Sequence, residues 1–199
     1  MKITNKLENL DTNLKFIKDK GNIKIGLRDI FKNNLNLFGF GKKEEKEEKL
    51  TNDKYFEIVK KGKLTIIPYS KEYKNAILFF HSFFKLGGSS NDIIRYLEKP
   101  YNNAAIVIST YNNISVYSGL CIYNLYEQHK LKYLHIDLLL YNSENIGNFI
   151  ISNFKDIKDD GFQIQTKTSD KDDIKLFKKN GFKKNNEKLD DNEALWILQ

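Results

Sequence analysis

The residues best suited to chemistry are a histidine and a carboxylate two positions apart, His135 and Asp137. They lie in the run 132–140, whose β-branched and apolar residues predict a strand. Because residues two apart in a strand point to the same face, we expect the two side chains to lie side by side. An imidazole accepts a proton near neutral pH, and a neighbouring carboxylate raises its basicity, so the pair is a candidate general base. The alternative is a structural hydrogen bond on a half-exposed face. We expect the opposite face of the strand to hold Leu134, Ile136, Leu138 and Leu140.

The other reactive side chains are scattered. His81 lies in an aromatic helical segment, and His129 lies in a predicted turn, so the three histidines do not form a zinc site. Cys121 lies between apolar strand residues, which favours packing over a nucleophilic role. The sequence has no nucleophile elbow, Walker loop or dinucleotide fingerprint.

The elements around the pair follow a mixed pattern of strands and helices. Their order from residue 61 onward is β-α-α-β-β-β-α-β-α-β-β, which predicts an α/β domain with a mixed, mostly antiparallel central sheet and helices on both faces. Asn112 and Asn113 predict a tight hairpin turn between two strands. The predicted strands are 64–67, 104–109, 114–126, 132–140, 162–166 and two at the C-terminus, and the helices cover 73–84, 90–97, 145–154 and about 172–180.

The last predicted helix ends at Gly181, a residue type that suits the left-handed conformation after a helix. A helix ending in Asn-Gly-Phe and followed by two closing strands resembles the C-terminal end of the GCN5-related N-acetyltransferase superfamily. The predicted order of elements over 61–199 is similar to the whole acetyltransferase domain of that family. The resemblance does not extend to the residues before 61.

In that family a central strand runs into a Gln/Arg-x-x-Gly-x-Gly/Ala turn that opens a helix and binds the pyrophosphate of acetyl-CoA. The corresponding residues here match only as Glu-x-x-Gly, from Glu144 to Gly147, and Phe149 replaces the last small residue. An acidic Glu144 repels a pyrophosphate, and an ordinary Asn/Ser helix cap is the alternative interpretation. The resemblance implies acetyl-CoA as cofactor, bound by Leu139, Leu140, Asn142, Ser143, Asn145, Ile146, Gly147 and Asn148.

The resemblance implies transfer of an acetyl group to an unidentified amine on a small molecule or a protein. His135 or Asp137 would assist deprotonation, and the backbone near Leu139 and Leu140 would polarise the thioester. Phe177 stands where many family members carry a tyrosine that protonates the CoA thiolate. The alternative is a catalytically inactive module of this fold that acts in protein interaction or assembly.

Residues 1–41 are predicted to form a separate helical arm, and 42–60 a charged linker to the domain at 61–199. The segment 25–38 has an apolar face opposite Arg28 and Lys32. This basic amphipathic helix would dock a protein partner, lie on a membrane, or pack on its own domain.

The net charge of +7 and pI of about 9.2 suit anionic partners such as CoA phosphates, nucleic acid or acidic lipid, although the lysine richness is also typical of AT-rich coding. Nucleic acid is the weakest of these partners, since no binding signature accompanies the charge. One cysteine, no transmembrane-length apolar run and no signal-peptide pattern lead us to expect a cytoplasmic protein.

Overall fold

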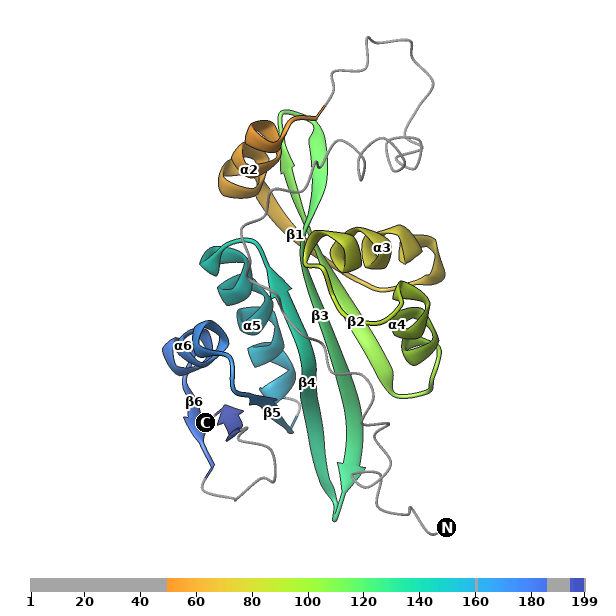
Figure 1. The fold of residues 1–199 in the computed structure, drawn as a ribbon. Helices are drawn as coiled ribbons and strands as arrows, with labels where there is room; N and C mark the ends of the chain where they lie inside the picture. The colour runs from red at the N-terminus through yellow and green to blue at the C-terminus, as the bar shows by residue number, and fades with distance from the viewer. Residues whose placement is uncertain (1–49, 160, 186–193, 199) are drawn as a thin grey trace.

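The computed structural model of the chain describes residues 50–159, 161–185 and 194–198. The predicted arm at 1–41 and the first part of the predicted linker lie outside the described residues. Figure 1 shows the elements in chain order. They are α2 (Asn52–Lys61), β1 (Lys63–Pro68), the 3-10 helix η2 (Lys71–Tyr73), α3 (Lys74–Phe83), α4 (Ser90–Leu97), β2 (Asn102–Tyr111), β3 (Ile114–Gln128), β4 (Leu131–Tyr141), α5 (Glu144–Asp159), β5 (Phe162–Thr168), α6 (Lys171–Lys179), β6 (Phe182–Lys184) and β7 (Ala194–Leu198).

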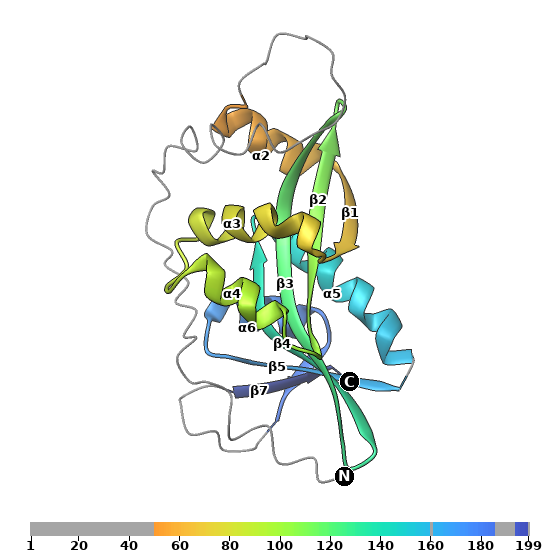
Figure 2. The same cartoon turned by 90° about the vertical axis from the view of Figure 1, so that its right-hand side faces the viewer.

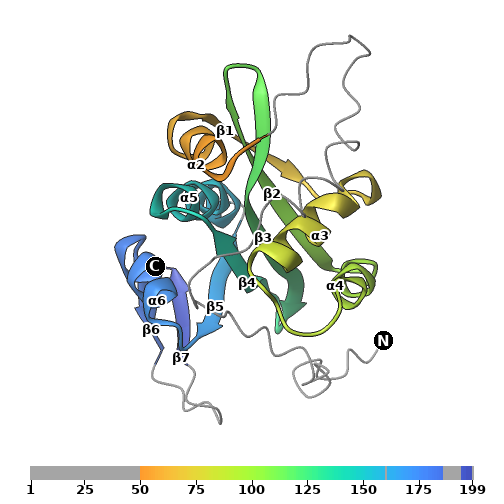
Figure 3. The same cartoon turned by 45° about the horizontal axis from the view of Figure 1, so that its top comes forward.

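The described strands form one seven-stranded sheet in the order β1-β2-β3-β4-β5-β7-β6. All neighbouring strands are antiparallel except β4 and β5, which are parallel and joined by α5. Helices α3 and α4 lie on one face, and α5 and α6 lie on the other (Figures 1 and 3). The predicted mixed, mostly antiparallel sheet with helices on both faces is therefore confirmed, and so is the predicted order of its elements.

The hairpin between β2 and β3 turns at Asn112 and Asn113, whose φ angles are 49° and 62°. Two successive residues with positive φ match the right-handed twist of the strands, and asparagine tolerates this conformation better than most residues. The predicted turn is confirmed. His129 and Lys130 make an equivalent turn between β3 and β4, with φ angles of 51° and 67°.

Helix α2 lies at the end of the sheet near the β2–β3 turn (Figure 2). Thr51 caps the helix by accepting a hydrogen bond from the Lys54 amide at 3.3 Å. The helix buries its apolar face, and the Tyr55 ring, fully buried, packs against Phe79 and Phe83 of α3. The described part of the segment predicted as a linker thus contributes Tyr55, Ile58 and Val59 to the core.

Strand β4 contains a β-bulge that changes which residues share a face. Ile122 of β3 pairs with Leu138, whereas the next residue of β3, Tyr123, pairs with Ile136. Asp137 is therefore an extra residue without an opposite partner on β3. The expected alternation is wrong after this point, because the bulge moves Leu138 and Leu140 to the face that carries Asp137.

Candidate active site at the gap between two central strands

Strands β4 and β5 pair over only part of their length. The parallel pairing runs from Lys132 opposite Phe162 to Ile136 opposite Thr166 and then stops, while β4 continues to Tyr141. At the last pair, the Thr166 hydroxyl donates a hydrogen bond to the Ile136 carbonyl at 3.0 Å. Among the described residues, no strand pairs with β4 on this side beyond the bulge. Backbone groups of Leu138, Leu139 and Leu140 thus border a gap in the sheet.

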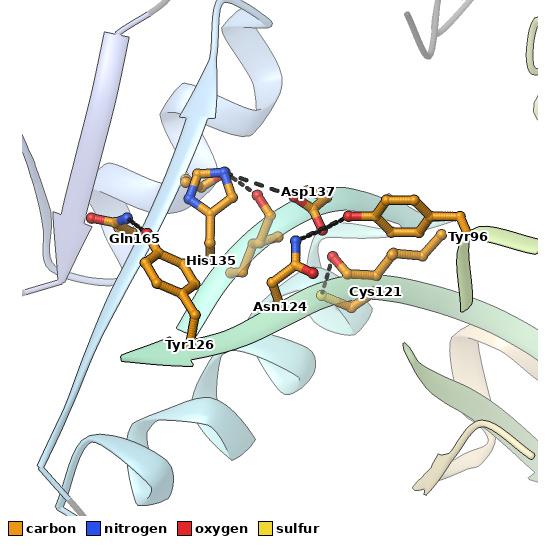
Figure 4. Close-up of polar contacts among 10 residues, drawn as sticks. Tyr96, Cys121, Asn124, Tyr126, His135, Asp137 and Gln165 are labelled. Atoms are coloured by element: carbon orange, nitrogen blue, oxygen red, sulfur yellow. Dashed lines mark hydrogen bonds and ion pairs between the residues drawn. The ribbon is translucent and has the colours of Figure 1, made fainter. Parts of the chain in front are cut away.

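The side chain of Asp137 lies at the start of this gap, in a polar cluster shown in Figure 4. The Tyr96 hydroxyl of α4 donates a hydrogen bond to Asp137 Oδ2 at 2.9 Å. The Asn124 amide of β3 donates to the same oxygen at 2.6 Å and to the Tyr96 hydroxyl at 3.0 Å. Side chains from two other elements, α4 and β3, therefore fix this carboxyl group.

Burial raises the pKa of the Asp137 carboxyl from 3.8 to about 7, although the hydrogen bond from Tyr96 opposes part of this effect. A carboxyl group with this pKa is present in both protonation states at neutral pH. The exposed fraction of the Asp137 side chain is 15%, so a substrate atom can reach it. These are the properties of a general base that works near pH 7.

His135 lies next to Asp137 on the same face, as the sequence predicts, but the two do not form a hydrogen bond. Their closest atoms, His135 Nε2 and Asp137 Oδ1, are 3.9 Å apart. Burial lowers the pKa of His135 to about 4, and the Lys167 charge adds to this effect, so the imidazole is neutral at pH 7. Its Nδ1 is buried and has no hydrogen-bond partner among the described residues. Of the two predicted residues, Asp137 is the better proton acceptor.

A pocket of about 340 Å³ lies where β4 ends and α5 begins. It is bordered by Asn142 and Ser143, two of the residues that the resemblance assigned to the cofactor. The Ser143 carbonyl accepts hydrogen bonds from the amides of Ile146 and Gly147. Among the described residues, no hydrogen bond occupies the amides of Glu144 and Asn145. The first turn of α5 thus presents amide donors and its positive dipole end beside the pocket. The full lining is Tyr141, Asn142, Ser143, Glu144, Asp172, Lys175 and Leu176.

Three of the other residues assigned to the cofactor, Ile146, Gly147 and Asn148, contact neighbouring elements instead of lining the pocket. Ile146 is fully buried, and a Cβ added to Gly119 of β3 would lie only 2.6 Å from its side chain. A Cβ on Gly147 would lie 2.7 Å from a methyl group of Leu176, so this glycine allows α6 to approach α5 closely. The Asn148 amide oxygen accepts a hydrogen bond from Asn180, which caps the end of α6, at 2.7 Å. These contacts hold the two helices together below the pocket.

Charged side chains near the pocket have mixed signs. The Glu144 carboxylate, which we expected to repel a pyrophosphate, forms an ion pair with Lys179 at 2.5 Å. Lys179 lowers the pKa of Glu144, so this carboxylate stays ionised. The positive charge of Lys179 balances its negative charge. Lys175 borders the pocket, and so does the carboxylate Asp172. The local charge is therefore less negative than the sequence motif alone indicates.

Two aromatic residues near the gap have clear structural roles. Phe177, which replaces the tyrosine of many acetyltransferases, is buried and packs against Phe182 with ring centroids 4.9 Å apart. Tyr141, at the end of β4, donates a hydrogen bond from its hydroxyl to Asp173 of α6 at 3.1 Å. Phe177 therefore offers no proton, and Tyr141 spans from the central strand to the last helix.

Three residues of this region have no local sequence signal that points to the site. Tyr96 and Asn124 bind Asp137, and Tyr55 donates to the Tyr117 carbonyl at 2.9 Å while accepting a hydrogen bond from Asn142. Tyr55 and Asn142 are 87 residues apart, and no local pattern indicates such a contact. Only the three-dimensional arrangement of α2, α4 and β3 reveals them.

Comparison with solved structures gives consistent matches over the described domain. The chain is similar to NAA60 of Arabidopsis thaliana, solved with a bisubstrate analogue (10% identity, TM-score 0.53, 68% of this chain and 97% of that one). It is also similar to the ribosomal-protein-S18-alanine N-acetyltransferase of Escherichia coli (13% identity, TM-score 0.50, 68% and 93%). A domain from Methanocaldococcus jannaschii matches with 14% identity and a TM-score of 0.52 over 69% and 98% of the two chains.

No family model matches the sequence, and no curated protein matches it either. Within the described residues, no helix combines the length and apolar character needed to cross a bilayer. The identities to the solved structures are low, so these matches establish the fold and not the reaction. The chain has the fold of the GCN5-related N-acetyltransferase superfamily.

Proposed function

We propose that this protein transfers an acyl group, most simply acetyl, from a CoA thioester to an amine. The observation that carries the proposal is the bulge at Asp137, which places a carboxyl group of pKa about 7 at the point where β4 and β5 separate. A sheet that opens at its centre and has a proton acceptor at the opening suits acyl transfer to an amine.

The residues around the gap and the pocket fit a CoA thioester. The backbone between Leu138 and Leu140 offers unpaired groups on the β5 side, and the amides of Glu144 and Asn145 suit a diphosphate at the start of α5. Lys175 adds a positive charge there. When bound, an acyl-CoA supplies an activated thioester carbonyl as the acyl donor.

The protein's own residues prepare the acceptor. Asp137, in its ionised form, accepts a proton from the ammonium or amine nitrogen, so that the nitrogen lone pair can form a bond to the acyl carbon. As this bond forms, the bond from the acyl carbon to the CoA sulfur breaks, and the thiolate leaves and takes a proton from water. Backbone amides of β4 next to the bulge would stabilise the negative charge on the carbonyl oxygen. His135 stays neutral and contributes packing and a polar edge to the acceptor side.

The test is release of free CoA thiol from acetyl-CoA in the presence of a panel of small amines and peptide amines. Wild-type protein is expected to release thiol with at least one class of amine. The Asp137→Asn variant should lose roughly 10²–10⁴ of the rate, which is the usual contribution of a general base. Equal rates for the two proteins would remove Asp137 from the reaction.

A second function, in protein interaction or assembly without catalysis, is favoured by the contacts that narrow the region proposed to bind the cofactor. Leu176 fills the space above Gly147, and Tyr141 is hydrogen bonded to Asp173 across the end of the gap. These contacts support a module that keeps the fold but lacks turnover and serves in protein interaction or assembly. Absence of acetyl-CoA binding to a folded wild-type protein would favour this second function.

A further inference from the structure

Tyr96 lies on a helix that is firmly fixed at both ends. At the start of α4, Ser89 and Asp92 form a capping box, in which each side chain binds the other residue's backbone amide. At the end of α4, the Asn102 side chain donates a hydrogen bond to the Tyr96 carbonyl at 2.7 Å. The helix buries Ile93, Ile94 and Leu97 against the domain. The Tyr96 hydroxyl is therefore presented to the sheet from a rigid support.

The contacts of Tyr96 make the two oxygens of Asp137 unequal. Oδ2 accepts hydrogen bonds from Tyr96 and from Asn124, at 2.9 and 2.6 Å. Among the described residues, Oδ1 accepts no hydrogen bond, and His135 Nε2 lies 3.9 Å from it. Oδ2 is thus held by two donors, whereas Oδ1 is held by none (Figure 4).

We infer that Tyr96 is a positioning residue, which together with Asn124 holds Asp137 by Oδ2 and leaves Oδ1 as the atom that takes the proton from the acceptor amine. The part of this inference that names an amine as the source of the proton rests on the proposed function. The geometric part, that Tyr96 sets the orientation and the acidity of Asp137, stands independently of turnover.

The acidity follows from the charges around the carboxyl group. The titratable groups that interact with Asp137 are Tyr96 from α4, Cys121 and Tyr126 from β3, and His135 from its own strand. Only Tyr96 among them donates a hydrogen bond to the carboxylate, and this bond lowers the pKa of Asp137. Removing the hydroxyl should therefore raise that pKa.

The experiment compares Tyr96→Phe with wild type by following the carbon-13 signal of the Asp137 carboxyl during a pH titration. The expected result is a rise of the Asp137 pKa by roughly one to two pH units, the usual effect of losing a hydrogen bond to a charged group. Asn124→Ala removes the other donor to Oδ2 and should raise the pKa in the same direction. Tyr123→Phe is the matched control, because it also removes a tyrosine hydroxyl close to the site. Tyr123 precedes Asn124 in β3, but its ring packs against Phe154 of α5, on the face of the sheet opposite to Asp137.

The pH dependence of kcat/KM for amine acetylation adds a second readout. In Tyr96→Phe the acidic limb of this profile should move to higher pH by the same amount as the Asp137 pKa. An unchanged Asp137 pKa in a folded Tyr96→Phe variant overturns the inference, whether or not the protein acetylates amines. A raised pKa without any turnover of acetyl-CoA supports the positioning role and counts against the proposed function instead.

Discussion

Replacement of Asp137 by asparagine should make the protein more stable at alkaline pH. The folded protein raises the pKa of this carboxyl above its ordinary value, so the folded state holds the proton more tightly than the unfolded state does. The stabilising contribution of the protonated group is fully present below about pH 3.8 and is lost as the pH rises through about 7. Asparagine keeps the shape and can accept the hydrogen bonds from Tyr96 and Asn124, but it does not ionise.

The size of the effect follows from the two pKa values. A folded-state pKa of about 7 against an ordinary 3.8 corresponds to roughly 4 kcal/mol between the ends of this pH range. His135 acts in the opposite direction, since its lowered pKa removes stability as the pH falls from 6.5 towards 4. Because His135 is present in both proteins, its contribution cancels when the variant is compared with wild type.

The assay is urea unfolding of wild type and Asp137→Asn at several pH values from 5 to 8. The difference in free energy of unfolding should grow with pH in favour of the variant and level off above the folded-state pKa. Glu127→Gln serves as the control, because Glu127 is an exposed carboxylate on β3 that takes no part in the polar cluster around Asp137. A stability difference that does not change with pH, or a variant less stable than wild type at pH 8, would show that folding does not raise the pKa of Asp137.

Three further predictions concern the site and its support. The His135→Gln variant should retain acetylation within about tenfold of wild type, as measured by thiol release, because the neutral imidazole is not the proton acceptor. Removal of residues 1–41 should leave cooperative unfolding intact, whereas removal of 1–61 should destabilise the domain by at least about 4 kcal/mol in denaturant titrations, because Tyr55, Ile58 and Val59 of α2 are buried. Gly119→Ala should lower the free energy of unfolding by about 1–3 kcal/mol in the same assay, since the added Cβ would lie 2.6 Å from a buried methyl group of α5.

The parts of the fold that local sequence signals determine were predicted well. The order of strands and helices follows from apolar periodicity, and the β2–β3 turn follows from a pair of asparagines that tolerate positive φ. Helix α2 was assigned to the linker because charged residues dominate the segment before it. Its buried Tyr55 could not be recognised, since the partners Phe79 and Tyr117 come from distant elements.

The candidate site could be predicted only in outline. The sequence placed His135 and Asp137 on one strand face, which the structure confirms. It could not show the bulge, because a one-residue shift between β3 and β4 depends on the pairing of two strands and not on either one alone. The bond from Tyr96 to Asp137 joins residues 41 positions apart, so no local pattern indicates it. Burial raises the pKa of Asp137 and lowers that of His135, which makes the carboxylate, rather than the imidazole, the better proton acceptor.

Binding of acetyl-CoA at the gap is tested most directly by adding acetyl-CoA to the nitrogen-15-labelled protein. The amide signals of Leu138–Leu140, Glu144 and Asn145 are monitored during this titration. These amide signals should shift saturably. At a hundred times the dissociation constant, acetyl-CoA should also stabilise the folded protein by roughly 2.7 kcal/mol and so raise its melting temperature. Unchanged signals at millimolar acetyl-CoA, or changes confined to lysines outside the gap, would contradict binding at the gap.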